Sequence, residues 1–230
     1  MNSTDKQTKT TEKPKKIGNF LYDFVKITGA IPMMLFFRPK KYFVGNGKPH
    51  KIKGNAVITS NHISFLDPII LHCVFWRRRL SCLATKNLYD TKLKKWFFDH
   101  MHCIIVDKEN FSMKSLHAVC DTLQSGKPVL IFPEGQVNRE NADNVMSFKW
   151  GAVLMAVRGK APVIPVYIVK REKWWQRQIV ILGDPIDVQA LVGERPSLKD
   201  LQRASEYVHD QEEALKNYYH EHIEKKPKEK

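Results

Sequence analysis

The sequence predicts a single α/β domain in which a central, mostly parallel or mixed sheet is flanked by helices. From Tyr42 onward, short β-type apolar runs alternate with stretches of helical periodicity. A length of 230 residues suits one domain with a sizeable core. The strands are expected at 56–60, 81–85, 103–106, 129–132, 163–169 and 178–182. The helices are expected at 68–76, 92–100, 112–124, 147–157 and 198–224.

The composition changes at both ends of this domain. Residues 1–16 are polar and lysine-rich and lack apolar periodicity, so we expect a disordered basic tail. Residues 17–41 are expected to form a membrane-interfacial helix or helical hairpin. The α/β domain then covers 42–225, including an amphipathic C-terminal helix, and 226–230 form a charged tail.

The membrane assignment rests on the apolar segment 17–37. This segment is about as long as a membrane span, but it contains three residues that a clean span would exclude: Asp23, Lys26 and Pro32. A span is therefore not favoured, although the length allows one. The almost wholly apolar second half is followed at once by basic residues, which is typical of a helix in the bilayer interface. A helix packed on the domain's own core remains the alternative.

The formal net charge of +14 indicates an anionic partner or surface, but it does not distinguish nucleic acid, a membrane leaflet and a phosphorylated substrate. Aromatic and cationic residues are interleaved at 76–79, 95–98 and 173–177, as in a headgroup-level belt or a single-stranded nucleic-acid site. The four cysteines form no C-x-x-C pair and no secretory signal opens the chain, which favours a reduced, cytosol-facing location.

A histidine and a carboxylate five positions apart stand out in the stretch NHISFLDP, residues 61–68. Side chains with this spacing diverge on one helix, because only the i+3 and i+4 neighbours share a face. Residues 55–60, however, read as a buried strand, and Asp67-Pro68 reads as a helix N-cap. His62 then lies in a loop that can bring its imidazole to Asp67, as in a general base with an orienting carboxylate. The alternative is an ordinary N-cap and a structural histidine.

The stretch FPEG, residues 132–135, follows another apolar strand. Its proline and glycine deliver Glu134 to a loop at the carboxyl end of that strand, where ligands bind in α/β sheets. The loop of Glu134 and the loop of His62 are therefore expected to face one crevice, with the histidine–carboxylate pair on the rim of a lipid-sized cavity. A glutamate that merely caps a turn is the alternative.

These two stretches, together with FKWGA at 148–152 and VIPV at 163–166, resemble the four ordered blocks of the glycerolipid acyltransferases, the family typified by lysophosphatidic acid acyltransferase. The similarity runs from about residue 47 to residue 188. It implies transfer of an acyl group from coenzyme A or acyl carrier protein to the free hydroxyl of a lysophospholipid such as 1-acyl-glycerol-3-phosphate, in phospholipid biosynthesis. The acyl thioester is then a substrate, and neither a further cofactor nor a metal is implied.

The resemblance assigns a role to individual residues. His62 would be the general base and Asp67 would orient it, while backbone N–H groups after Asp67 or in the Glu134-Gly135 turn would stabilise the oxyanion. The expected substrate-binding residues are Asn61, Ser64, Lys86, Lys108, Glu134, Gly135, Gln136, Arg139 and Pro165.

The sequence departs from the family pattern directly after Gly135. The family usually continues with Thr-Arg, and its arginine is taken to hold the acceptor's phosphate, whereas this chain has Gln136 and Val137. Arg139 is the nearest substitute. We therefore expect an acceptor that differs from plain lysophosphatidic acid.

The expected partners are an anionic phospholipid surface, acyl-CoA and a lysophospholipid, with no nucleic acid. The expected location is the cytoplasmic face of a membrane, as a peripheral or monotopic protein. A second hypothesis is a non-catalytic basic module that binds lipid or RNA on the same fold. A metal site at His100, His102 and Cys103 is disfavoured, because alternation would send His102 and Cys103 to opposite faces of an extended segment.

Overall fold

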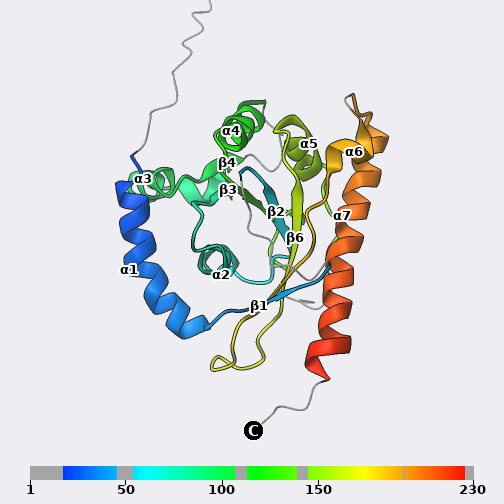
Figure 1. Cartoon of the computed structure of the whole chain (residues 1–230). Helices are drawn as coiled ribbons and strands as arrows, with labels where there is room; N and C mark the ends of the chain where they lie inside the picture. Colours follow the sequence, from blue (N-terminus) through cyan, green and yellow to red (C-terminus); the bar gives the residue numbers. More distant parts are fainter. Residues whose placement is uncertain (1–17, 46–53, 107–112, 139–144, 194, 226–230) are drawn as a thin grey trace, which may run out of the picture.

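The computed structural model describes residues 18–45, 54–106, 113–138, 145–193 and 195–225 (Figure 1). It confirms the expected α/β fold with a central sheet between helices. The seven strands are β1 (Lys40–Phe43), β2 (Val57–Ser60), β3 (Ser81–Thr85), β4 (Ile104–Val106), β5 (Val129–Ile131), β6 (Val163–Ile168) and β7 (Ile179–Leu182). The α-helices are α1 (Phe20–Phe37), α2 (Asp67–Val74), α3 (Lys92–His100), α4 (Met113–Gln124), α5 (Gly151–Arg158), α6 (Val188–Val192) and α7 (Leu198–Tyr219). A 3₁₀ turn, η1 (Lys86–Tyr89), precedes α3, and a π-helical turn, η2 (His220–Glu224), continues α7.

The strands form one mixed sheet in the order β1-β7-β6-β2-β5-β3-β4. All neighbours are parallel except β6 and β7, which form an antiparallel hairpin. Because β2, β5 and β6 are parallel neighbours, the chain leaves all three at the same edge of the sheet. The loops after β2 and β5 therefore lie next to each other, as the sequence predicts for His62 and Glu134.

Strand β1 was not expected. Lys40 and Lys41 pair with Ile179 and Val180 of β7, so they belong to the sheet and do not merely flank the preceding helix. The chain changes direction at Arg38, which caps α1 in the left-handed conformation with φ of 44°, and this turn brings the next residues beside β7. The described part of this segment, residues 18–41, therefore contains one helix followed by an edge strand and not two helices.

The alternation of strand side chains divides the core between the two faces of the sheet. Ile58, Leu130 and Val166 pack against α2 and the end of α1. Their neighbours Val57, Val129 and Val163 face the opposite layer, built from α4, α5, α6 and α7. Figure 1 shows α1 along the outside of α2, and α7 along the far side of the sheet.

The charged residues of α1 contact the protein, while large apolar side chains are exposed on the opposite face of the helix. Asp23 forms an ion pair with Arg79, with 2.7 Å between Oδ2 and Nη2, and Lys26 donates a hydrogen bond to the Arg78 carbonyl. The exposed side chains recur every three or four residues and form one stripe, named here the outer stripe: Phe20, Phe24, Ile27, Ile31 and Leu35. By length and composition α1 is able to cross a membrane, yet its charges are occupied by contacts within the domain.

Helix α5 begins at Gly151, four residues later than expected. The Lys149 N–H donates to the Pro133 carbonyl at 3.1 Å, which holds the segment before α5 against the FPEG loop in a non-helical conformation.

The 1–16 tail and the 226–230 tail lie outside the described residues, so the expected division of the chain into two tails, a membrane-interfacial segment and one α/β domain remains a prediction.

Candidate active site

The side chains of His62 and Asp67 meet at the carboxyl edge of the sheet. His62 lies two residues beyond β2, and its Nδ1 is 2.9 Å from Oδ2 of Asp67. The loop between them provides the bend that a continuous helix would not allow. When Nδ1–H donates a hydrogen bond to the carboxylate, the lone pair on Nε2 is free to accept a proton from a substrate.

Asp67 is fully buried and turns its carboxylate back toward the loop. The same Oδ2 accepts hydrogen bonds from the backbone N–H groups of Ile63 and Ser64, both at 2.7 Å. The N-cap position belongs to Leu66, and Asp67 occupies the first turn of α2. The N-cap assignment of Asp67 was therefore wrong, because its side chain organises the preceding loop rather than the helix terminus.

The His62 ring is also held from the neighbouring loop. It stacks on Phe132, with ring centroids 4.1 Å apart and an interplanar angle of 19°. The His62 carbonyl accepts a hydrogen bond from the Asn138 N–H at 2.7 Å. The side chain nevertheless keeps 16% of its surface exposed, so the imidazole is fixed in place but remains accessible.

Two buried carboxyl groups lie behind this pair. Glu134 is only 5% exposed, and burial raises its pKa to about 7, while nearby backbone of Met146 and His62 lowers it in part. Glu212 projects from α7 and is fully buried, and burial raises the pKa of its carboxyl well above the usual range, with the nearby charge of Glu134 adding to the effect. Among the described residues, no oxygen of either carboxyl has a hydrogen-bond partner of ordinary geometry.

The predicted site residues do not include Lys149, whose side chain places a cation at the site. A Cβ atom placed on Gly135 would lie 3.3 Å from its Nζ, so the ammonium group sits directly beside the turn after Glu134. Gly135 has φ of 73°, a conformation that favours glycine. The neighbouring Gln136 is exposed, and its amide contacts the sulfur of Met146.

The other predicted site residues fall into different environments. Asn61 is buried and clamps the end of β6, donating to the Ile168 carbonyl at 3.0 Å and accepting from the Ile168 N–H at 2.7 Å. Pro165 is buried within β6, and Lys86 is exposed at the start of η1. Ser64 lies in the His62 loop and accepts a hydrogen bond from the Leu66 N–H. Lys108 and Arg139 lie outside the described residues.

One backbone donor expected to stabilise an oxyanion, the Gly135 N–H, is already occupied, and so are two donors of the loop that precedes Asp67. The N–H groups of Ile63 and Ser64 donate to Asp67, and the Gly135 N–H donates to the Phe132 carbonyl at 3.0 Å. In this arrangement the ammonium group of Lys149 is the nearest positive charge to the Glu134-Gly135 turn that the structure describes.

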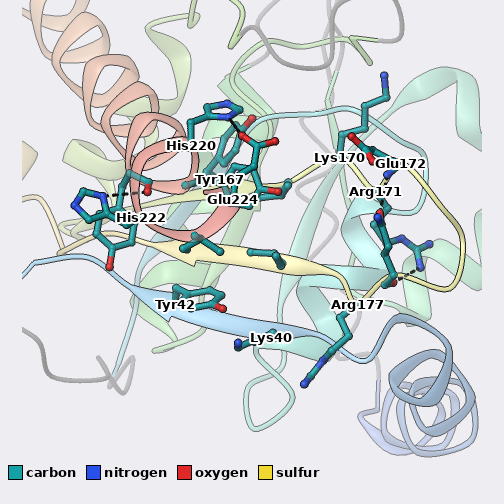
Figure 2. Close-up of a pocket in the computed structure, with 16 residues that line it drawn as sticks. Lys40, Tyr42, Tyr167, Lys170, Arg171, Glu172, Arg177, His220, His222 and Glu224 are labelled. Atoms are coloured by element: carbon teal, nitrogen blue, oxygen red, sulfur yellow. Dashed lines mark hydrogen bonds and ion pairs between the residues drawn. The ribbon is translucent and has the colours of Figure 1, made fainter. Parts of the chain in front are cut away.

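Exposed apolar side chains form part of the rim beside His62, notably Phe65, Leu66 and Ile69. A cavity of about 1190 Å³ lies elsewhere in the described part of the chain. It is lined by residues of β1, the β6–β7 hairpin and η2, and neither His62 nor Asp67 contributes to it (Figure 2). That the His62–Asp67 pair lies on the rim of a lipid-sized cavity stays a prediction, since this cavity is a separate one.

Comparisons with known proteins agree with this architecture. A family model described as Acyltransferase matches residues 41–169. The 1-acyl-sn-glycerol-3-phosphate acyltransferase of Bacillus subtilis is 28% identical over 170 residues, which cover 70% of this chain and 81% of that protein. A probable 1-acyl-sn-glycerol-3-phosphate acyltransferase of Mycoplasma genitalium is 29% identical over 154 residues, 64% of this chain and only 55% of the relative.

A solved structure shares the fold. The crystal structure of the 1-acyl-sn-glycerophosphate (LPA) acyltransferase PlsC from Thermotoga maritima superimposes with a TM-score of 0.58 at 19% identity, covering 86% of this chain and 80% of that one. Because the family model spans more than half of its length, the chain belongs to the acyltransferase family.

Proposed function

We propose that the protein transfers a fatty acyl group from acyl-CoA, or from an acyl carrier protein, to the free hydroxyl of a lysophospholipid, with His62 as the general base. The observation that carries this proposal is the 2.9 Å contact between His62 Nδ1 and Asp67 Oδ2. It is supported by family membership and by two matched relatives named as 1-acyl-sn-glycerol-3-phosphate acyltransferases.

The chemistry needs a base because an alcohol is a poor nucleophile at neutral pH. The hydroxyl oxygen attacks the thioester carbonyl carbon while its proton passes to Nε2 of His62. The tetrahedral intermediate then collapses, the carbon–sulfur bond breaks, and the imidazolium returns the proton to the departing thiolate. Asp67 fixes the tautomer and stabilises the imidazolium, and no covalent enzyme intermediate is required.

The acceptor is proposed to carry a phosphate held partly by Lys149. Val137 offers no charged group where the family has arginine, whereas the Lys149 ammonium lies beside Gly135. A flexible point charge constrains a phosphate less than a bidentate guanidinium does. We therefore propose a lysophospholipid acceptor other than lysophosphatidic acid alone.

The reaction is proposed to occur at the cytoplasmic face of a membrane, with α1 lying in the interface. The outer stripe exposes large apolar side chains, for example Phe20 at 84% and Leu35 at 73%. Asp23 and Lys26 are held by the domain, so α1 cannot leave it to span a bilayer without breaking these contacts. Such a helix is suited to burial of its apolar face at the headgroup–acyl boundary.

The experiment measures release of the coenzyme A thiol from acyl-CoA with a panel of lysophospholipids differing in headgroup. His62→Ala should reduce the rate roughly 10²- to 10⁴-fold while leaving vesicle binding unchanged. Absence of thiol release by the intact protein with every acceptor would favour the non-catalytic lipid-binding alternative. An exclusive preference for lysophosphatidic acid would contradict the proposed acceptor but not the reaction.

A further inference from the structure

The cavity of about 1190 Å³ lies on the opposite side of β6 from the His62 loop. Figure 2 shows basic side chains gathered around the β6–β7 hairpin and β1, while η2 closes the other end of the cavity with its histidines. The hairpin loop, residues 169–178, leaves the sheet next to the end of α1, as Figure 1 shows. The basic end of the cavity, at the hairpin loop, therefore lies close to the end of α1.

The cavity has an excess of positive charge that the protein does not neutralise. Its four cations are Lys40, Lys170, Arg171 and Arg177. Among the described residues, none of these four has a carboxylate within 4 Å. Two acids also line it: Glu224 is 2.6 Å from His220 Nδ1, and Glu172 lies on the hairpin loop. The cations thus outnumber the carboxylates.

Two of these cations are held in place by main-chain carbonyls. Arg171 donates to the Trp174 carbonyl at 3.0 Å, and Arg177 donates to the Arg38 carbonyl at 3.2 Å. Within the described part of the chain, Lys40 and Lys170 make no side-chain hydrogen bond, and the Lys40 Nζ lies 4.9 Å from the centre of the Tyr42 ring. The cavity thus combines guanidinium groups held by main-chain carbonyls with ammonium groups whose donors are not used in this way, a mixture suited to a phosphate.

The hairpin loop is joined to α1 through aromatic contacts. The Arg171 guanidinium carbon lies 4.6 Å from the centre of the Phe37 ring, and Trp174 stacks on Phe36 with centroids 6.5 Å apart. Trp174 and Trp175 are 68% and 54% exposed. Exposed tryptophans with neighbouring cations are typical of headgroup depth in a bilayer. The cavity is therefore flanked by a surface that continues the outer stripe.

We propose that this cavity binds the phosphate of an anionic phospholipid from the bilayer on which α1 rests. The cations hold the phosphate, and aliphatic side chains such as Val169, Ile179 and Ile223 contact the glycerol end of the lipid. The nucleotide phosphates of coenzyme A share this chemistry, but a water-soluble nucleotide does not require the flanking tryptophans. This inference rests on the membrane part of the proposed function. The site itself is separate from the His62–Asp67 pair.

The position of the cavity also couples it to the catalytic loop. Asn61, which precedes His62, is hydrogen-bonded to both backbone groups of Ile168, and Val169 and Lys170 follow directly in the cavity wall. A lipid bound at this wall therefore fixes the same strand end that positions the His62 loop.

The test compares the binding of the full chain to two kinds of vesicle: phosphatidylcholine alone, and phosphatidylcholine with 20% phosphatidylglycerol, a composition set roughly to match an anionic leaflet. The variant Lys40→Gln/Lys170→Gln removes two charges from the cavity. The matched control, Lys199→Gln/Arg203→Gln, removes two exposed charges from the first turns of α7, about 20 residues and roughly 30 Å along the helix from η2. His62→Ala serves as background, so binding is measured without turnover.

The cavity variant should lose roughly 10- to 30-fold in affinity for the anionic vesicles and little for the neutral ones, while the control loses less than about threefold. Equal losses in the two variants would show that only long-range charge acts, and would overturn the proposal. Displacement by inorganic phosphate, dependent on Lys40 and Lys170, would identify a site for free phosphate rather than for a lipid and would overturn the proposal. Displacement by adenosine 3′,5′-bisphosphate, dependent on Lys40 and Lys170, would assign the cavity to the thioester donor and equally overturn it.

Amine acetylation of the unaltered protein provides a second measurement that does not depend on the folding of a variant. Anionic vesicles should protect Lys40 and Lys170 from acetylation and leave Lys199 unchanged. If all three lysines react equally with and without vesicles, the cavity does not hold a lipid. Because no step measures acyl transfer, failure here leaves the proposed reaction intact.

Discussion

One carboxylate oxygen of Asp67 holds both the His62 ring and the loop that carries it. Oδ2 lies 2.9 Å from His62 Nδ1 and accepts two further bonds from the backbone of that loop. Its position inside the protein, fully removed from solvent, means that no water replaces these contacts if the carboxylate is lost.

Substitution of Asp67 should separate catalysis from folding. Asp67→Asn keeps an oxygen for the backbone N–H groups but removes the negative charge that stabilises the imidazolium, so kcat/KM should fall roughly 10²- to 10⁴-fold with little loss of stability. Asp67→Ala should also lower the free energy of unfolding by about 2–4 kcal/mol, because two N–H groups lose their acceptor. Steady-state kinetics and urea unfolding measure the two effects. A fully active Asp67→Asn enzyme would show that His62 does not depend on this carboxylate.

Glu134 should make the protein less stable as the pH rises toward neutrality. Its pKa is raised by burial from 4.5 to about 7, so the folded state binds this proton more tightly than the unfolded state. The contribution of this raised pKa to the free energy of unfolding is fully present below pH 4.5. It is lost progressively up to about pH 7, and the loss is at most about 3 kcal/mol. Urea unfolding at pH 5 and pH 8 should show the decline, and Glu134→Gln should reduce it. An identical decline in the variant would contradict the burial-raised pKa.

Glu212 should contribute to the same decline over a wider pH range, because burial raises its pKa well above the usual range. The stability of Glu212→Gln relative to the unaltered protein should therefore increase from pH 5 to pH 8, by about 1 kcal/mol or more. The double variant with Glu134→Gln should deviate from additivity, since each carboxyl raises the cost of ionising the other. Strict additivity in unfolding experiments would indicate that the two groups do not interact.

The outer stripe of α1 should determine membrane affinity without determining stability. Phe24→Ser/Ile31→Ser/Leu35→Ser removes exposed apolar side chains, so binding to neutral vesicles should fall roughly 100-fold, whereas the free energy of unfolding should change by less than about 1 kcal/mol. Phe37→Ser, on the same helix but buried, is the contrast: it should destabilise the fold by about 3 kcal/mol. Vesicle flotation unaffected by the triple substitution would rule out the outer stripe as the docking surface.

Lys149 should affect the acceptor step selectively. Lys149→Ala should raise KM for a phosphate-bearing lysolipid about tenfold and leave the KM for acyl-CoA nearly unchanged, because its ammonium lies at the Glu134-Gly135 turn. Lys199→Ala, at the far end of α7, is the matched control. A change in both Michaelis constants would instead indicate a general effect on the loop.

The sequence predicts the geometry of the site where several signals within a short segment indicate the same elements. The strand–loop–helix pattern around residues 56–74 correctly predicted that the imidazole of His62 and the carboxylate of Asp67 would meet. Strand β1 was missed because its pairing with β7 is set by the turn at Arg38 and joins segments about 140 residues apart. Such long-range edge pairing leaves no periodic pattern in four residues.

Glu212 shows a signal that could have been used. It falls between Val208 and Leu215, at the i+4 and i−3 positions of the apolar stripe of α7, where a charged residue is out of place. A polar residue on an apolar stripe predicts a buried polar group, although not its neighbours. That Glu134 is the neighbour follows only from the packing of α7 on the sheet.

The fixed attachment of α1 to the domain has a kinetic consequence. If the protein docks on a bilayer through α1 as proposed, its active site meets the acceptor by lateral diffusion, so the controlling quantity is the mole fraction of lysolipid in the surface rather than its bulk molarity. Adding inert lipid to the vesicles should slow turnover, whereas diluting the whole suspension at constant vesicle composition should leave the rate per bound enzyme unchanged.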